Sequence, residues 1–149
     1  MPNLFQKSLK KNFSRARIRN RYGVFALREE FQSFVPHFTR ALRRLFSVKG
    51  IVGTEITLYL AGNEIMSTNI LVFPATKNFP DPEASGIPLG EIFLNLVWIR
   101  DHDENPMFML IHGVLHLLGY DHEETHDRIR MEQEEKRLLA DTELCQILL

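Results

Sequence analysis

Apolar positions along the chain follow two spacings, one typical of strands and one typical of helices. Residues 54–61 (TEITLYLA) and 68–75 (TNILVFPA) are rich in β-branched and aromatic residues, which predicts two strands. The turn-like AGNE joins them, and so short a link favours antiparallel neighbours. Residues 90–99 (GEIFLNLVWI) are apolar on both faces, so we expect another strand that is central or covered.

The helical spacing is clearest between residues 27 and 45, where an apolar side chain recurs every three or four positions. Pro36 should kink or restart this helix, and Gly50 marks its exit. A second helix is expected after Asn105, which can cap it before a proline in the first turn. This helix is apolar nearly all round, which predicts a buried position, and Gly119 should end it.

Two other segments complete the expected elements. Residues 75–90 contain three prolines and two glycines between Ala75 and Gly90, which predicts a long loop. Residues 125–139 are charged on most faces and should form a surface helix that begins with acidic residues, where they suit the helix dipole.

Near the N-terminus, the stretch SRARIRNRYG alternates basic with other residues, a period of two that predicts a strand. One face of this strand would carry four arginines: Arg15, Arg17, Arg19 and Arg21. Residues 1–50 hold 12 Lys and Arg against 2 acids, and residues 101–149 hold 4 against 12, although the net charge is only -1. The basic part can form a surface for polyanions, but two oppositely charged solvated faces explain the counts equally well.

The bulk composition indicates a soluble globular protein. A chain of 149 residues is long enough for one domain with its own core, so we expect a single domain over residues 1–149. Cys145 is the only cysteine, which favours a reducing compartment. The sequence shows neither a membrane-spanning run nor a signal peptide, and we expect a cytoplasmic protein.

Three of the six histidines lie in the stretch HGVLHLLGYDH. His112 and His116 are four residues apart, which places both imidazoles on one face of a helix. Because Gly119 should end that helix, His122 can fold back towards the same point. Buried histidines with ordinary hydrogen bonds are the structural alternative, but each would need its own polar partner in an apolar helix.

Three histidine ligands that leave a fourth position to water are typical of a catalytic zinc site, since structural zinc favours four protein ligands and cysteine. We therefore predict one Zn²⁺ per chain, bound by His112, His116 and His122, and hydrolytic chemistry. Asp121 is the candidate catalytic residue, as a proton acceptor or an orienting group, although an aspartate after a helix-ending glycine is also a common loop residue.

The same histidine block, H-G-x-L-H-L-x-G-Y-D-H, resembles the signature of the YbeY family residue for residue. TNILVFP (68–74) is similar to the T-[DN]-V-L-S-F-P segment of that family, and LGEIFL (89–94) resembles its L-G-D-I segment. The resemblance implies an α+β fold: a single domain with a mixed sheet of about four strands packed against helices, one of which carries the first two metal-binding histidines.

It also implies an activity and partners. A protein of this kind is a zinc-dependent endoribonuclease specific for single-stranded RNA. It acts in maturation of ribosomal RNA, at the 3′ end of the small-subunit RNA, and in ribosome quality control, with the small ribosomal subunit as partner.

The sequence departs from the family pattern in one functional segment. The family has an arginine within L-N-x-x-Y-R before the T-[DN]-V-L-S-F-P strand, whereas here only AGNEIMS (61–67) precedes it and no arginine lies between Lys49 and Arg100. If that arginine steadies a phosphate, the candidates to replace it in substrate binding are Arg15, Arg17, Arg19 and Arg21. The alternative is a weaker nuclease.

Two other functions stay open. A metallopeptidase would use the same histidine spacing as H-E-x-x-H, with the glutamate as general base, but Gly113 occupies that position here. A non-catalytic, ribosome-associated protein could use the metal to stiffen its fold.

Overall fold

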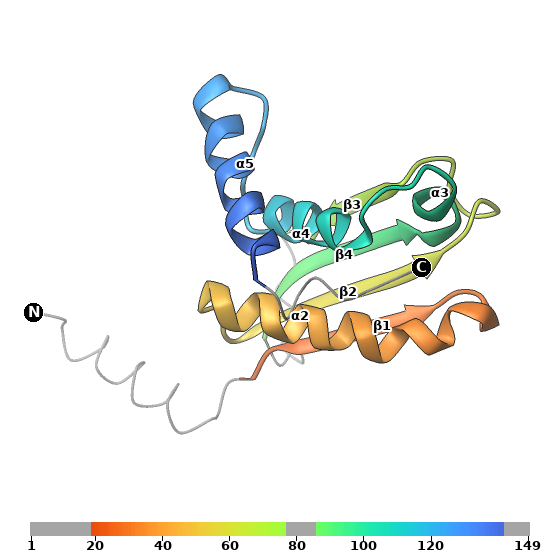
Figure 1. Ribbon diagram of the computed structural model, residues 1–149. Coiled ribbons are helices and arrows are strands. Elements are labelled where there is room, and N and C mark those ends of the chain that lie inside the picture. Colours follow the sequence, from red (N-terminus) through yellow and green to blue (C-terminus); the bar gives the residue numbers. More distant parts are fainter. Residues whose placement is uncertain (1–18, 77–85, 142–149) are drawn as a thin grey trace, which may run out of the picture.

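The computed structural model describes residues 19–76 and 86–141 (Figure 1). In chain order the elements are β1 (Arg21–Ala26), the 3₁₀ helix η1 (Glu29–Phe34), α2 (Val35–Lys49), β2 (Thr54–Ala61), β3 (Ile70–Pro74), β4 (Ile87–Asn95), α3 (Leu96–Asp101), α4 (Pro106–Leu117) and α5 (Thr125–Leu139).

The four strands form one mixed sheet with the order β1-β2-β4-β3. β1, β2 and β4 are parallel, and β3 is antiparallel to β4. The expectation that 54–61 and 68–75 are neighbours is therefore wrong, because β4 lies between them. β4 takes an inner place: Ile92 and Leu94 on its helix-facing side are fully buried, and Phe93 on the opposite side is half-buried.

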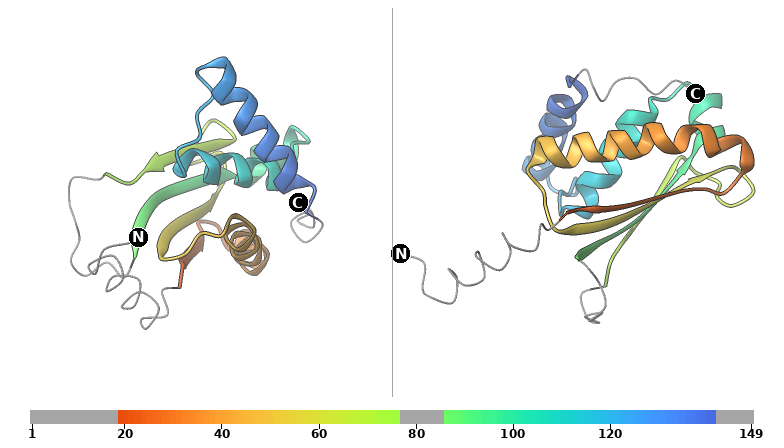
Figure 2. Two further views of the ribbon diagram at one scale, coloured as in Figure 1. Left: turned by 90° about the vertical axis from the view of Figure 1, so that its left-hand side faces the viewer. Right: turned by 90° about the horizontal axis from the view of Figure 1, so that it is seen from below.

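The helices pack on one face of the sheet, as the view from below shows (Figure 2). α2 packs against β1, α4 packs against β3 and β4, and α5 packs against α4. The core lies between these helices and the sheet, and α4 lies deep within it. The largest fully buried side chains of this core include Phe38, Phe46, Leu42, Leu58, Ile92 and Leu110.

The opposite face of the sheet carries a row of four aromatic side chains, one from each strand. Successive ring centroids along Phe25, Tyr59, Phe93 and Phe73 are 5.8, 4.5 and 5.8 Å apart. These contacts link the strands side by side on the face that α2 and α4 leave uncovered.

Asn95 ends the strand that was expected to continue to residue 99. Its side chain accepts the backbone N–H of Trp98 at 2.9 Å, which caps α3, so residues 96–101 are helical. The same fully buried amide donates to Asn63 and to the Met66 carbonyl oxygen, at 2.9 and 3.2 Å, and thereby fixes the short segment after β2. Trp98 is accordingly a half-buried helical residue, stacked on His102.

The first strand begins later than the alternating arginines predict. Arg21 is its first residue, and Arg19 precedes it; Arg15 and Arg17 lie outside the described residues. The side chain of Asn20, just before the strand, donates to the Ile51 carbonyl oxygen and accepts from the backbone and hydroxyl of Thr54. The prediction that one strand carries all four arginines is therefore wrong for Arg19, which precedes the strand.

The helical predictions are confirmed more closely. η1 leads into α2, which starts at Val35 with Pro36 in its first turn and ends at Gly50, where φ is 68°. α4 and α5 occupy the expected segments. The loop predicted over residues 75–90 ends earlier than expected, because β4 begins at Ile87. Residues 77–85 of this loop and Cys145 lie outside the described residues. Among the described helices, none has the length and apolar character needed to cross a bilayer.

Candidate metal centre

Two of the three clustered histidines are held by α4. The Asn105 side chain accepts the backbone N–H groups of Met107 and Phe108 and so caps the helix. One turn separates His112 from His116, and their ring centroids are 4.6 Å apart. Their Nε2 atoms are 3.1 Å apart, so either one ring donates a hydrogen bond to the other or both nitrogens bind one cation.

The third histidine reaches the same region through a tight helix end. Gly119 has φ 94°, and the N–H groups of Gly119 and Tyr120 bond back to the carbonyl oxygens of His116 and Leu115, both at 3.0 Å. This is a Schellman motif, which reverses the chain after α4. The His122 ring then lies 5.0 Å from that of His116 and 6.1 Å from that of His112.

Asp121 shapes the turn that presents His122. Its Oδ1 accepts the backbone N–H of His122 at 2.6 Å and that of Glu123 at 3.2 Å. The carboxylate therefore has the loop role that its position after Gly119 suggested. Its role in proton transfer stays a prediction.

The spacing of the two helical histidines suits a tetrahedral ion. Two nitrogens bound to one zinc at about 2.0–2.1 Å lie about 3.3 Å apart, close to the 3.1 Å between the Nε2 atoms of His112 and His116. His122 is the most exposed of the three and lies on a loop. Three imidazoles and no cysteine form a donor set that fits a catalytic zinc centre better than a structural one.

The two helical histidines favour the neutral form that a metal requires. Burial lowers the pKa of His112, and the nearby His122 lowers it further. Burial likewise lowers the pKa of His116, assisted by the other two imidazoles and opposed by the Asp121 carboxylate. Because a protonated imidazole has no lone pair for a cation, these shifts make both side chains available as ligands at neutral pH.

Glu135 is a further polar residue at the centre, and the sequence analysis missed it. It is 5% exposed, and its Oε2 lies 3.6 Å from His112 Nδ1. Among the described residues, His112 Nδ1 is the one buried side-chain nitrogen or oxygen without a hydrogen-bond partner. Burial and then the charge of Glu132 raise the pKa of Glu135, while His122 opposes them. The signal in the sequence is an acid on the buried stripe of α5, between Met131 and Leu138.

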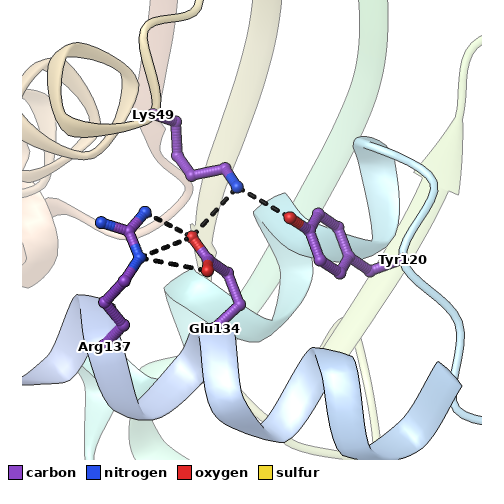
Figure 3. A network of polar contacts seen from close by, with 4 residues as sticks. All are labelled: Lys49, Tyr120, Glu134 and Arg137. Carbon is purple, nitrogen blue, oxygen red and sulfur yellow. Dashed lines mark hydrogen bonds and ion pairs between the residues drawn. The ribbon is translucent and has the colours of Figure 1, made fainter. Parts of the chain in front are cut away.

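A polar network ties the His122 loop and α5 to α2 (Figure 3). Lys49, the last residue of α2, donates to the Tyr120 hydroxyl at 2.8 Å and to Glu134 at 3.0 Å. Arg137 donates from Nε to both oxygens of Glu134 at 3.1 Å. Burial lowers the pKa of Lys49, but its bonds to Tyr120 and Glu134 raise it by more. Three segments distant in sequence are thus joined beside the histidines.

Gly113 and Gly90 allow α4 to lie close to the sheet. A Cβ atom at Gly113 would come within 2.9 Å of Ile70 and 3.0 Å of Ile92. Gly90 has φ 138°, and a Cβ there would lie 2.2 Å from the Phe73 carbonyl oxygen and 2.9 Å from Leu117 at the end of α4. Gly90 and Gly113 therefore allow α4, the helix that carries His112 and His116, to pack closely on the sheet.

Of the four predicted arginines, the structure describes Arg19 and Arg21, and Arg21 does not face the histidines. Tyr22 packs on Phe46 of α2, so its neighbour Arg21 points to the other face of the sheet, where its guanidinium lies 3.7 Å from Glu55. Arg19 is exposed and precedes the strand. Their role in substrate binding stays a prediction.

A second group of possible metal ligands lies at the start of α5. One ligand atom from each of Glu124, His126 and Asp127 lies within 4.8 Å of the others. Glu124 and His126 are exposed, and the two acids belong to the helix start that the sequence predicts. Exposed acidic groups of this kind are common without an ion.

Together, the fold and the cluster define a class of protein: a mixed sheet with one covered face and a core helix that carries two clustered histidines. The same fold occurs in TM1509 from Thermotoga maritima, whose solution structure matches with a TM-score of 0.54 at 20% identity. The match covers 83% of this chain and 88% of that one.

Sequence comparison identifies the family. Residues 59–143 match the model of the family described as Endoribonuclease YbeY, so the chain belongs to the YbeY family. A relative from Anaplasma marginale (strain Florida) named Endoribonuclease YbeY is 41% identical over 85 residues, which cover 50% of this chain and 50% of that protein. A relative of the same name from Sulfurovum sp. (strain NBC37-1) is 36% identical over 107 residues, which cover 58% of this chain and 73% of that protein. The chain thus spans about half the length of the Anaplasma relative.

Proposed function

We propose that the protein is a zinc-dependent endoribonuclease that cleaves single-stranded RNA, with His112, His116 and His122 as the ligands of one Zn²⁺. The observation that carries the proposal is the convergence of three imidazoles at the end of α4. When bound, zinc supplies a water of lowered pKa and polarises a phosphoryl oxygen. The protein holds His112 and His116 neutral through burial, and the Asp121 turn directs His122 towards them.

The proposed substrate and partners follow from the family. Relatives of this chain are named as endoribonucleases, which makes RNA the substrate class. We place the activity in maturation of ribosomal RNA at the 3′ end of the small-subunit RNA and in ribosome quality control, and hence in the cytoplasm beside the small ribosomal subunit. We also propose that the whole chain, residues 1–149, forms one domain of this family.

The proposed substrate-binding residues are four arginines near the N-terminus: Arg15, Arg17, Arg19 and Arg21. They are the candidates because the segment between β2 and β3 contains no arginine. Each phosphate contact to a single strand contributes about 0.7 to the slope of log affinity against log salt. Replacing Arg19 and Arg21 together with glutamine should therefore flatten this slope and leave the zinc content unchanged. An unchanged slope would assign both side chains to surface charge instead.

The position of Gly113 weighs against the peptidase alternative. In an H-E-x-x-H peptidase the second residue is the general base. Here that position is buried and faces Ile70 and Ile92 of the sheet, so even a glutamate side chain would be directed into apolar packing. The non-catalytic alternative is separated from the nuclease by the experiment below.

The test is cleavage of an end-labelled single-stranded RNA by the purified chain, with Zn²⁺ added and with the metal removed by a chelator. Activity should disappear in chelator, return with Zn²⁺ and be lost in His116→Ala. His102→Ala is the matched control, since His102 is exposed and stacks on Trp98 away from the cluster. Zinc-loaded protein that cuts no RNA would leave the non-catalytic function, and cleavage of a peptide substrate would favour the peptidase.

A further inference from the structure

Glu135 is an acid in a position that otherwise belongs to the core. Its neighbours on the buried side of α5 are Met131 and Leu138, which are 1% and 0% exposed, and Glu135 itself is 5% exposed. Burying a carboxylate among apolar side chains costs free energy unless a polar group faces it. The group that faces it is the imidazole of His112, at 3.6 Å from Oε2 to Nδ1.

The two nitrogens of His112 point to different partners. Nε2 lies 3.1 Å from Nε2 of His116, on the side where the histidines converge. Nδ1 is directed away from that side, towards Glu135, and is buried without a hydrogen bond. A neutral imidazole that offers Nε2 to a cation must carry its proton on Nδ1, and a buried N–H needs an acceptor.

We propose that Glu135 is the positioning residue of the metal centre: when the metal is bound, its carboxylate closes the present 3.6 Å gap, accepts the Nδ1–H of His112 and so fixes the tautomer and ring orientation in which Nε2 binds the metal. This inference rests on the proposed metal centre and extends it to α5. Carboxylates that accept from the outer nitrogen of a ligating histidine hold the ring in place and increase its basicity. Glu135 does not touch the substrate in this role; it acts through His112.

The neighbouring acid on α5 explains how Glu135 is held at this distance. Glu134 is bonded to Lys49 of α2 and to Arg137 one turn along α5 (Figure 3). These bonds fix α5 against α2, while the helical rotation between consecutive residues turns Glu135 towards α4. Two adjacent acids thus have separate tasks, one in anchoring the helix and one in facing the histidine.

The experiment compares Glu135→Ala, Glu135→Gln and Glu135→Asp with Glu132→Gln in the full chain. Zn²⁺ affinity is measured by competition with a chromophoric chelator, and the Co²⁺-loaded proteins are compared by their visible absorption bands. Glu135→Ala should weaken Zn²⁺ binding about 10–100-fold and shift the Co²⁺ bands. Glu135→Gln should weaken binding less, because an amide oxygen still accepts the N–H, and Glu135→Asp should restore part of the affinity.

Glu132→Gln is the matched control, because it removes an acid from the exposed side of the same helix and leaves the bonds of Glu134 in place. This variant should keep its Zn²⁺ affinity and Co²⁺ spectrum. If Glu135→Ala does not fold, the nearly isosteric Glu135→Gln decides. Wild-type affinity and spectrum in the folded Glu135 variants would overturn the inference and leave the metal centre intact. A wild-type chain that binds neither Zn²⁺ nor Co²⁺ would overturn both.

Discussion

Lys49, the last residue of α2, donates a 2.8 Å hydrogen bond to the hydroxyl of Tyr120, two residues before His122. Its Nζ also lies 4.9 Å from the centre of the Tyr120 ring. A residue more than 70 positions away in sequence therefore fixes the loop that presents the third histidine. The cluster depends on α2 as well as on α4.

Replacing Lys49 with methionine should lower both stability and metal affinity. The variant keeps an apolar stem of similar length but leaves Glu134 and Tyr120 without their shared donor, at a cost of about 2 kcal/mol in the free energy of unfolding. Because the loop before His122 loses its anchor, Zn²⁺ affinity should fall as well. Urea unfolding and a chelator competition measure the two effects. The exposed Lys136→Met is the control, and equal Zn²⁺ affinity in both variants would contradict the anchoring role.

Glu134 should make stability depend on acid pH. Its bonds to Arg137 and Lys49, opposed by burial, lower its pKa from 4.5 to about 2. A carboxyl group whose pKa is lower in the folded state stabilises the fold above its unfolded pKa, and this contribution is lost as the pH falls through the folded pKa. The full change in pKa corresponds to ~3.4 kcal/mol. Because solvent screens these ion pairs, Glu134→Gln at pH 7 should lower the free energy of unfolding by about 2 kcal/mol.

The difference between this variant and the wild type should narrow as the pH falls from 4.5 towards 2. Urea unfolding at a series of pH values measures the difference directly. A gap that stayed constant across this interval would mean that the ion pairs of Glu134 add no pH-dependent stability.

Gly113→Ala should destabilise the protein although alanine favours helices. The new methyl group would lie 2.9 Å from Ile70 and 3.0 Å from Ile92, and crowding of this kind costs about 1–3 kcal/mol. That cost exceeds the gain of roughly 1 kcal/mol from helix propensity. Ser47→Ala, on the exposed side of α2, is the control for propensity alone and should be neutral or slightly stabilising. A more stable Gly113→Ala protein would show that the terminal methyl groups of Ile70 and Ile92 move aside without cost.

Zinc should stabilise the folded chain through the three histidines. At a free concentration 100 times its dissociation constant, a ligand adds about 2.7 kcal/mol, which corresponds to a rise of roughly 5–10 °C in melting temperature for a domain of this size. Thermal unfolding followed by circular dichroism, with Zn²⁺ and with chelator, measures the rise. It should vanish in His116→Ala and persist in His126→Ala. Loss of the shift only in His126→Ala would place the ion at the start of α5 instead.

Helical spacing in the sequence predicted the histidine cluster because both of its determinants are local. The four-residue interval between His112 and His116 fixes a common face, and Gly119 fixes the reversal that brings His122 near. Glu135 and Lys49 come from other helices, and no local pattern states which helices meet. Only the acid between Met131 and Leu138 on the buried stripe of α5 signals a polar partner.

The errors in the predicted sheet have equally specific causes. The apolar run after Asn95 is compatible with a strand or with a buried helix. It forms a helix whose first turn is capped by the Asn95 side chain, which accepts the backbone N–H of Trp98. A short connection between two strands does not exclude a later strand from the space between them. The strand predicted from the alternating arginines begins only at Arg21 in the described chain, and the side chain of the preceding Asn20 is bonded to Ile51 and Thr54.

The place of β4 between β2 and β3 also dictates an order of assembly during synthesis. β1 and β2 can pair as soon as both have left the ribosome, but β3 meets no partner among the strands made before it. Its edge stays exposed until residues 87–95 follow, and α4 has no complete surface to pack on before then. A nascent chain that stops short of β4 therefore has two paired strands and one unpaired segment. The histidine cluster can form only after His122 has left the ribosome.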